Sequence, residues 1–305
     1  MTPTATNSTS PVPLVPAPAP SGETKQESLK QDNAAVFRFP KPPQYDSLEE
    51  ERSARRARLA AAYRVFADQN LSEGIAGHLT YRDPILTDHF WVAPFGIAFD
   101  EVCASDLLLI APDGSVTMGG GSNASLKGHE KLYNRAAFAI HHALHTARPD
   151  IDAACHSHSF YGKAFSTLGR NIDITTQDSC LFHNDISHYA NFGGVVLAEE
   201  EGGNIARALG DKNHSIILQN HGILTAGSTI EGAVFRFIAL EKHCQVMLTA
   251  EPAAIAHGGP GAKPVQIDEE DATYTHKQIA GENLVYFQAK PYFQRVTRGN
   301  TDYMN

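Results

Sequence analysis

The apolar residues of this chain first adopt helical spacing at about residue 47. Ser47-Leu-Glu-Glu50 has the form of a capping box, in which a serine and a glutamate three residues later cap the first turn of a helix. Leu59 and Phe66 follow on one helical face, and arginines occupy much of the rest. We therefore expect an amphipathic helix that ends near Gln69.

Shorter apolar runs between turn residues predict the remaining elements. Strands are expected in GIAGHLTYRD, in HFWVAPFG and at residues 107–110, 116–118, 153–156, 193–197 and 215–219. Helices are expected at residues 128–146, 160–168, 199–209, 268–279 and 285–296, and from the capping box Ser228-Thr-Ile-Glu231 to about Ala250. Because these elements interleave without a strict βαβ repeat, the pattern predicts an α/β fold with a largely antiparallel sheet covered by helices on both faces.

The first 45 residues differ from the rest of the chain. They contain six prolines before Ser21, and the first aromatic residue is Phe37. Such a segment buries too little apolar surface to offset the entropy of ordering, so we expect residues 1–45 to be a disordered tail. Residues 46–252 then form one domain, and residues 253–305 a helical extension that packs on it. We expect neither a secretory signal nor a membrane span, because no apolar run is long enough.

The charge and the cysteines restrict the partners and the compartment. A formal net charge of -9 argues against binding to nucleic acid or to an acidic membrane surface. The four cysteines include no CxxC pair, which is typical of reduced thiols in a cytoplasmic protein. One of them, Cys155, precedes a histidine of interest, and we expect it to be a small buried hydrophobe on the opposite face of its strand.

Three histidines stand at the ends of predicted strands. His156 and His158 are two residues apart, so in an extended strand both side chains point to the same face. His221 ends a second apolar run and is followed by glycine. Three imidazoles leave one position of a divalent metal open, which is typical of a catalytic site. Imidazole suits zinc, our first expectation, and it also suits iron.

These segments resemble the class II aldolase/adducin family. The similarity extends from about Leu48 to Ala250 and rests on GIAGHLTYRD, FWVAPFG, SDLLLI, IHHALHTARPDIDAACHSHSFYGKAFS, EEEGGNIARALG and IILQNHGILTAG. The resemblance implies a three-layer α/β/α domain and a homotetramer with active sites at the subunit interfaces. It also implies a divalent metal held by His156, His158 and His221.

The chain departs from the sugar-phosphate aldolases of this family at four places. Their acid/base glutamate corresponds to Ala137, and the two serines that hold the substrate phosphate correspond to Arg135 and Ala136. A threonine–glycine turn that contacts the phosphate is replaced by Phe95-Gly96, and an asparagine by His78. We therefore expect a small substrate without a phosphate.

Other residues must then perform the proton transfer and bind the substrate. We expect His78 and His141 to be catalytic, with three further candidates for the missing base, His142, His145 and Glu130. Arg135 could receive a substrate carboxylate, because its guanidinium matches that geometry. Substrate contacts are expected from Phe95, Gly96 and Tyr161. Gln177, Asp178 and His183 could either contact the metal or support its ligands.

Three functions are consistent with these residues. The first is a metal-dependent carbon–carbon lyase that acts beside the carbonyl of a small hydroxy- or oxo-acid. The second is a mononuclear non-haem iron oxygenase, because some bacterial natural-product enzymes that resemble this family use iron and dioxygen to decarboxylate aryl-oxo acids. The third is a non-catalytic, adducin-like protein of the cytoskeleton. Retention of the three histidines favours catalysis.

Overall fold

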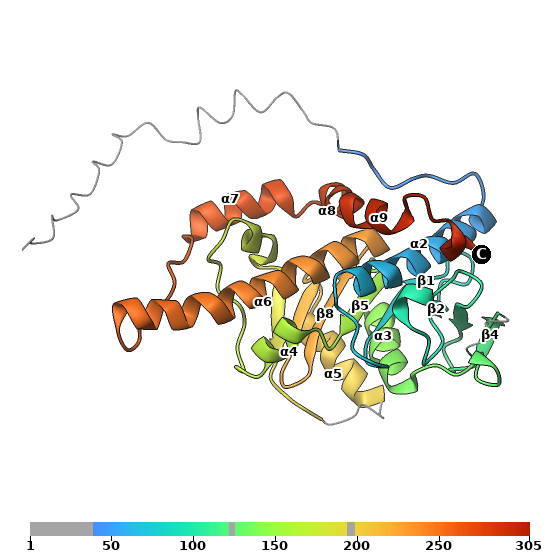
Figure 1. The fold of residues 1–305 in the computed structure, drawn as a ribbon, viewed down its shortest axis with the longest axis horizontal. Coiled ribbons are helices and arrows are strands. Elements are labelled where there is room, and N and C mark those ends of the chain that lie inside the picture. The colour runs from blue at the N-terminus through green and yellow to red at the C-terminus, as the bar shows by residue number, and fades with distance from the viewer. Residues whose placement is uncertain (1–38, 122–125, 194–198) are drawn as a thin grey trace, which may run out of the picture. The chain divides into compact units, whose positions relative to one another are not determined.

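The computed structural model describes residues 39–121, 126–193 and 199–305. These residues form an eight-stranded sheet between two layers of helices (Figure 1). This arrangement confirms the predicted α/β class and its three-layer form. Of the expected tail, residues 1–38 lie outside the described part, as do most residues of the strand expected at 193–197.

The strands follow the order β4-β3-β2-β1-β5-β8-β7-β6 in the sheet. Neighbours are antiparallel except for the edge pair, β6 and β7, which is parallel. In chain order the strands are β1 (His78–Arg82), β2 (Phe90–Val92), β3 (Leu108–Ile110), β4 (Val116–Gly119), β5 (Ala153–Ser157), β6 (Ile186–Tyr189), β7 (Ser215–Leu218) and β8 (Gly222–Gly227).

Helices α2 and α6 cover one face of the sheet, and α3 and α5 cover the other (Figure 1). None of the helices in the described ranges is long and apolar enough to cross a lipid bilayer. The helices are α2 (Leu48–Asp68), α3 (Arg135–Ala147), α4 (Phe160–Ser166), α5 (Glu199–Leu209), α6 (Ile230–Gly258), α7 (Glu269–Ile279), α8 (Glu282–Gln288) and α9 (Lys290–Thr297), with short 3₁₀ turns η1 (Phe99–Glu101), η3 (Asp178–Phe182) and η4 (Asp302–Met304).

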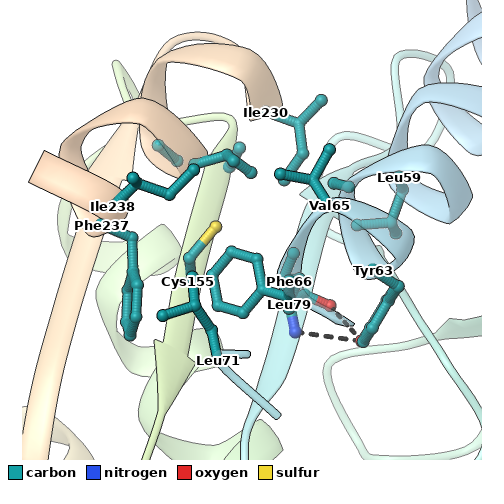
Figure 2. Close-up of a cluster of buried hydrophobic side chains, with 14 of the residues drawn as sticks. Leu59, Tyr63, Val65, Phe66, Leu71, Leu79, Cys155, Ile230, Phe237 and Ile238 are labelled. Atoms are coloured by element: carbon teal, nitrogen blue, oxygen red, sulfur yellow. Dashed lines mark hydrogen bonds between the residues drawn. The ribbon is translucent and has the colours of Figure 1, made fainter. Parts of the chain in front are cut away.

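The core between the sheet and the first helix layer joins residues that are far apart in the chain. Phe66 of α2 packs on Phe237 of α6, with ring centroids 4.8 Å apart (Figure 2). Cys155 of β5 belongs to this cluster and is fully buried, which places its thiol on the sheet face opposite His156. Burial raises the pKa of that thiol well above its ordinary value, so Cys155 acts as a hydrophobe, as expected.

Several predicted boundaries differ from the structure. The helix expected from residue 128 begins only at Arg135, because the side chain of Asn134 accepts a hydrogen bond from the Ala137 N–H and caps it there. The cap of α6 is Thr229 rather than Ser228, and the helix continues through Pro252. The final predicted helix is two helices, α8 and α9. Strands β6 and β8 have no counterpart among the sequence predictions.

A partly buried ion pair attaches α8 to α6. The side chain of Arg236 on α6 is only 1% exposed and pairs with Glu282, which caps no helix but also accepts a hydrogen bond from Ser228. Burial alone would raise the pKa of Glu282, but the Arg236 charge and these hydrogen bonds hold it below its ordinary value. The pair fixes the C-terminal helices against the start of α6.

Replacing Glu282 by alanine is expected to lower the free energy of unfolding by about 2 kcal/mol. This is below the roughly 3–5 kcal/mol typical of breaking a fully buried pair, because Glu282 is 39% exposed. Urea denaturation measures the loss, and Glu282→Gln, which keeps the shape and one acceptor oxygen but loses the charge and the second acceptor, should lose less stability than the alanine variant. Equal stability of the alanine variant and the unmodified protein would contradict this attachment.

Candidate metal centre

The three histidines predicted to form a metal site lie at one end of the central strands of the sheet. His156 is on β5, His158 follows the end of that strand, and His221 occupies the turn between β7 and β8. The antiparallel pairing of β5 with β8 places His156 opposite Leu224, so the carboxyl end of β5 meets the β7–β8 turn. Sheet topology therefore brings His221 beside His156 and His158, which precede it by more than sixty residues in the sequence.

The side chains of His156, His158 and His221 converge. Their potential ligand atoms all lie within 4.8 Å of one another. The ring centroid of His221 is 4.7 Å from that of His156 and 4.9 Å from that of His158. Three nitrogens at this separation can be ligands of one metal ion, because metal–nitrogen bonds are about 2.0–2.1 Å long.

Hydrogen bonding and burial prepare these rings for ligation. Nδ1 of His156 donates to the backbone carbonyl of Ile223 at 2.9 Å, which leaves the lone pair on Nε2. Burial lowers the pKa of His156 well below its ordinary value and lowers that of His221 to about 4. Burial also lowers the pKa of His158. The imidazoles are therefore neutral at pH 7 and have lone pairs available for a metal.

Two close contacts hold the backbone around these histidines. Gly77 has a φ of +91°, and a Cβ there would lie 2.9 Å from the carbonyl oxygen of His156. Only glycine permits this approach, which sets the start of β1 against the end of β5. On the other side, the carboxylate of Glu241 accepts hydrogen bonds from the N–H groups of Tyr161 and Gly162, at 2.8 and 2.7 Å, and so caps α4.

The histidines face a cavity of about 420 Å³. Its walls contain His78, whose position was predicted to contact substrate, together with Phe95 and Ala137. Ala137 therefore lies where the family resemblance puts the acid/base glutamate, and its methyl group supplies no proton carrier. The complete lining is Ile75, Ala76, Gly77, His78, Phe95, Asn134, Ala136, Ala137, Ile140, His156, His158, Lys163, Phe192, Asn220 and His221.

A chain of hydrogen bonds lies behind His78. His145 Nδ1 can only donate to the Ile151 carbonyl, at 3.2 Å, so its Nε2 accepts from the Thr80 hydroxyl at 2.8 Å. The Thr80 oxygen then accepts from Nδ1 of His141 at 2.7 Å, which leaves a lone pair on Nε2 of His141. That nitrogen is buried without a hydrogen bond, and the His141 ring centroid is 3.8 Å from that of His78.

His78 is buried beside His141, the last member of this hydrogen-bond chain, and it also lines the cavity. It is 4% exposed, and neither ring nitrogen has a side-chain hydrogen-bond partner. Burial lowers its pKa to about 3, against a smaller opposing effect of the Ala137 backbone, so the ring is neutral at pH 7. A neutral buried imidazole without a side-chain partner can still form a hydrogen bond to a guest molecule.

The remaining predicted site residues lie elsewhere. Arg135 is exposed on α3 with its guanidinium near the Tyr133 ring, and Gly96 is exposed beside Phe95. The hydroxyl of Tyr161 accepts a hydrogen bond from Gln245 on α6. None of these three lines the cavity, and neither does any of the secondary candidates Glu130, His142, His145, Gln177, Asp178 and His183.

The sequence predictions missed one charged residue of the cavity, Lys163. It lies on α4, five residues after His158, and pairs with Glu73. The sequence gives a weak signal for it, because a lysine on a short helix after a metal-binding strand is most often solvated. Ile75 and Phe192 also line the cavity and were not predicted. They are large apolar residues with exposed fractions of 60% and 59%.

The sequence profile of the class II aldolase and adducin N-terminal domain matches residues 57–248. The chain belongs to this family. A solved structure of L-fuculose 1-phosphate aldolase from Glaciozyma antarctica PI12 is 46% identical, with a TM-score of 0.74, and the match covers 84% of this chain and 93% of that one. The fold of this relative agrees with the three layers described above.

Two bacterial relatives match over a longer part of the chain. Decarboxylase NovR from Streptomyces niveus is 34% identical over 266 residues, which are 87% of this chain and 92% of the relative. The protein named 4-hydroxy-3-prenylphenylpyruvate oxygenase/4-hydroxy-3-prenylbenzoate synthase, from Streptomyces roseochromogenus subsp. oscitans, is 34% identical over 266 residues, 87% of this chain and 89% of the relative. The family therefore includes relatives named for different reactions.

Proposed function

We propose that this protein is a metal-dependent enzyme that breaks or forms a carbon–carbon bond beside the carbonyl of a small, unphosphorylated oxo- or hydroxy-acid. The observation that carries the proposal is the convergence of three neutral imidazoles on one cavity whose other walls are mostly apolar. A structural metal site would be closed by a fourth protein ligand, whereas this group of three faces open space.

His156, His158 and His221 would hold the metal. Their ligand atoms are close enough, their lone pairs are free at pH 7, and their donor type suits zinc first and iron second. When bound, a divalent metal would supply positive charge that stabilises an oxyanion on the substrate. The three ligands are uncharged, so they would not reduce that charge.

His78 would be the residue that handles the substrate proton. It lines the cavity beside Ala137, and its ring nitrogens have no side-chain hydrogen-bond partner. His141 would support His78 from behind rather than touch the substrate, because it is fully buried and does not line the cavity. Proton transfer by a positioned imidazole contributes typically about 10²–10⁴-fold to a rate.

The cavity walls favour an apolar substrate over a sugar phosphate. Phe95 and Ala136 replace the groups that hold the phosphate in the sugar-phosphate aldolases, and Ile140 lies beside them. Arg135, Gly96 and Tyr161 have no place in this proposal, because their side chains or backbone lie outside the cavity. Phe95 remains as a substrate contact.

Iron-dependent oxygenation of an aryl-oxo acid is the second candidate. It is favoured by the aromatic and aliphatic cavity walls, and by the names of the two Streptomyces relatives, a decarboxylase and an oxygenase of a prenylphenylpyruvate. That chemistry requires no carboxylate base at the position of Ala137. It would use the same three histidines.

Oxygen consumption distinguishes the two reactions. The protein loaded with zinc or with ferrous iron is mixed with phenylpyruvate or 4-hydroxyphenylpyruvate, with an oxygen electrode and product analysis as the readouts. Cleavage without oxygen uptake supports the lyase, and oxygen uptake with loss of carbon dioxide in the iron form supports the oxygenase. Purified protein with no affinity for zinc or iron would overturn both and favour the non-catalytic, adducin-like function.

Light scattering, which measures the molar mass in solution, tests the expected homotetramer.

A further inference from the structure

We propose that Lys163 binds the carboxylate of the substrate and thereby selects acids over neutral molecules. The inference rests on the proposed function and adds the residue that recognises the acid group. Lys163 lines the same cavity as the three histidines and His78. Lys163 thus takes the role that the sequence suggested for Arg135. Arg135 does not line the cavity.

The charge of the cavity wall is the first argument. Among the described residues other than histidine that line it, Lys163 is the one with a formal charge. No aspartate or glutamate lines this wall within the described ranges. The other side chains are apolar apart from Asn134 and Asn220. Beside the proposed metal, which would bind the substrate carbonyl, one ammonium group in a mostly apolar cavity fits a molecule that has a carboxylate and an apolar body.

The second argument is that the ion pair which Lys163 already forms is weak. Its ammonium pairs with Glu73, but the two side chains are 39% and 55% exposed. Exposed pairs of this kind contribute little stability, because water screens the charges and two flexible side chains must be ordered. A substrate carboxylate inside the cavity, where less water competes, can therefore replace Glu73 at small cost.

The backbone that carries Lys163 is held firmly, which is the third argument. The N–H of Lys163 donates to Ser159 at 2.8 Å, and the carboxylate of Glu241 caps the start of the same helix through Tyr161 and Gly162. The lysine stem is flexible, but its origin is fixed relative to His158 on the same segment. The ammonium can thus move between Glu73 and the cavity without a change of backbone.

A carboxylate fits this site better than a phosphate does. A phosphate dianion is usually held by several charged or N–H donors, with arginine favoured for its paired hydrogen bonds. Here one ammonium and the side-chain amides of Asn134 and Asn220 are the side-chain donors other than imidazole among the described lining residues. The ammonium of Lys163 matches one carboxylate.

The test is binding of matched ligands to the zinc-loaded protein, measured by calorimetry. Phenylpyruvate carries the carboxylate, and phenylacetone is a neutral comparator with the same ring and ketone. Lys163→Met is expected to weaken phenylpyruvate binding by about 10- to 100-fold, the range for loss of a charge-assisted hydrogen bond. The same variant should bind phenylacetone and zinc as the unmodified protein does.

Two further variants separate charge from shape. Lys163→Arg keeps the charge and should bind phenylpyruvate within a few-fold of the unmodified protein. Glu73→Gln removes the competing carboxylate and should bind it equally well or more tightly. Phenylpyruvate binding that is unchanged in Lys163→Met, or an equal loss of both ligands, would overturn the assignment while the proposed reaction stands. If the unmodified zinc form binds no phenylpyruvate, the assignment and the proposed substrate class both fail.

Discussion

Replacement of His221 by alanine is expected to abolish stoichiometric metal binding and reduce turnover to background. The β7–β8 turn supplies this ligand alone, so the variant keeps only the His156 and His158 pair. Loss of a residue that merely supports a ligand lowers metal affinity by about 10- to 100-fold, and loss of a ligand itself should exceed this. Elemental analysis of the purified variant measures the metal content directly.

Thermal stability gives a second readout that requires no substrate. A metal present at about 100 times its dissociation constant stabilises a protein by about 2.7 kcal/mol. A chelator should therefore lower the Tm of the unmodified protein and leave that of His221→Ala unchanged. His257→Ala is the matched control, because His257 is exposed on α6. A His221→Ala variant that retains one metal per chain would exclude the triad as the binding site.

The sequence predicted the elements whose ends are marked by local chemistry. Ser47 caps α2 as expected, with its side chain accepting a hydrogen bond from the Glu50 N–H, and α5 has the predicted bounds. The predicted start of α3 at residue 128 was wrong, because the side chain of Asn134 caps the helix and Arg135 is its first residue. Local signals decide such boundaries only when they are read together.

The missed strands have a different cause. β6 (Ile186–Tyr189) has only one buried residue and follows a polar stretch, so its pattern is not that of a half-buried strand. It exists because β7 offers a parallel edge for pairing. β8 is entirely buried, and its run GILTAG lacks the alternation of apolar and polar residues by which a strand is recognised in the sequence. Pairing partners distant in the chain decide both strands.

The candidate site also combines features that local sequence predicts with features that depend on distant packing. The two-residue spacing of His156 and His158 predicts a shared face, and the structure brings His221 to them. Whether Arg135 or Lys163 faces the cavity cannot be predicted this way, because it depends on how α3 and α4 are rotated about their axes. Arg135 is the first residue of α3 and points to solvent, whereas Lys163 lies on a helix fixed by Glu241.

Replacement of Thr80 by valine is the second change expected to have a large effect. Thr80 is fully buried and its hydroxyl joins His141 to His145, which are also buried. Valine keeps the volume but leaves the N–H of His141 and the lone pair of His145 without partners. Each unsatisfied buried group costs about 1–3 kcal/mol, so the loss of partners for two groups should lower the free energy of unfolding by roughly 2–6 kcal/mol.

Thr80→Ser is the matched control, since it keeps the hydroxyl and loses only a methyl group. If the hydroxyl matters, the serine variant should be the more stable of the two in urea denaturation, although valine is closer to threonine in shape. The valine variant should also lose turnover, by about 10-fold or more. The reason is that His141 no longer holds the orientation that supports His78. The variant should keep its metal. A valine variant as stable and as active as the serine variant would mean that the hydrogen-bond chain behind the cavity contributes nothing. Loss of stability with unchanged turnover would limit the chain to a structural role and leave His78 to act without support.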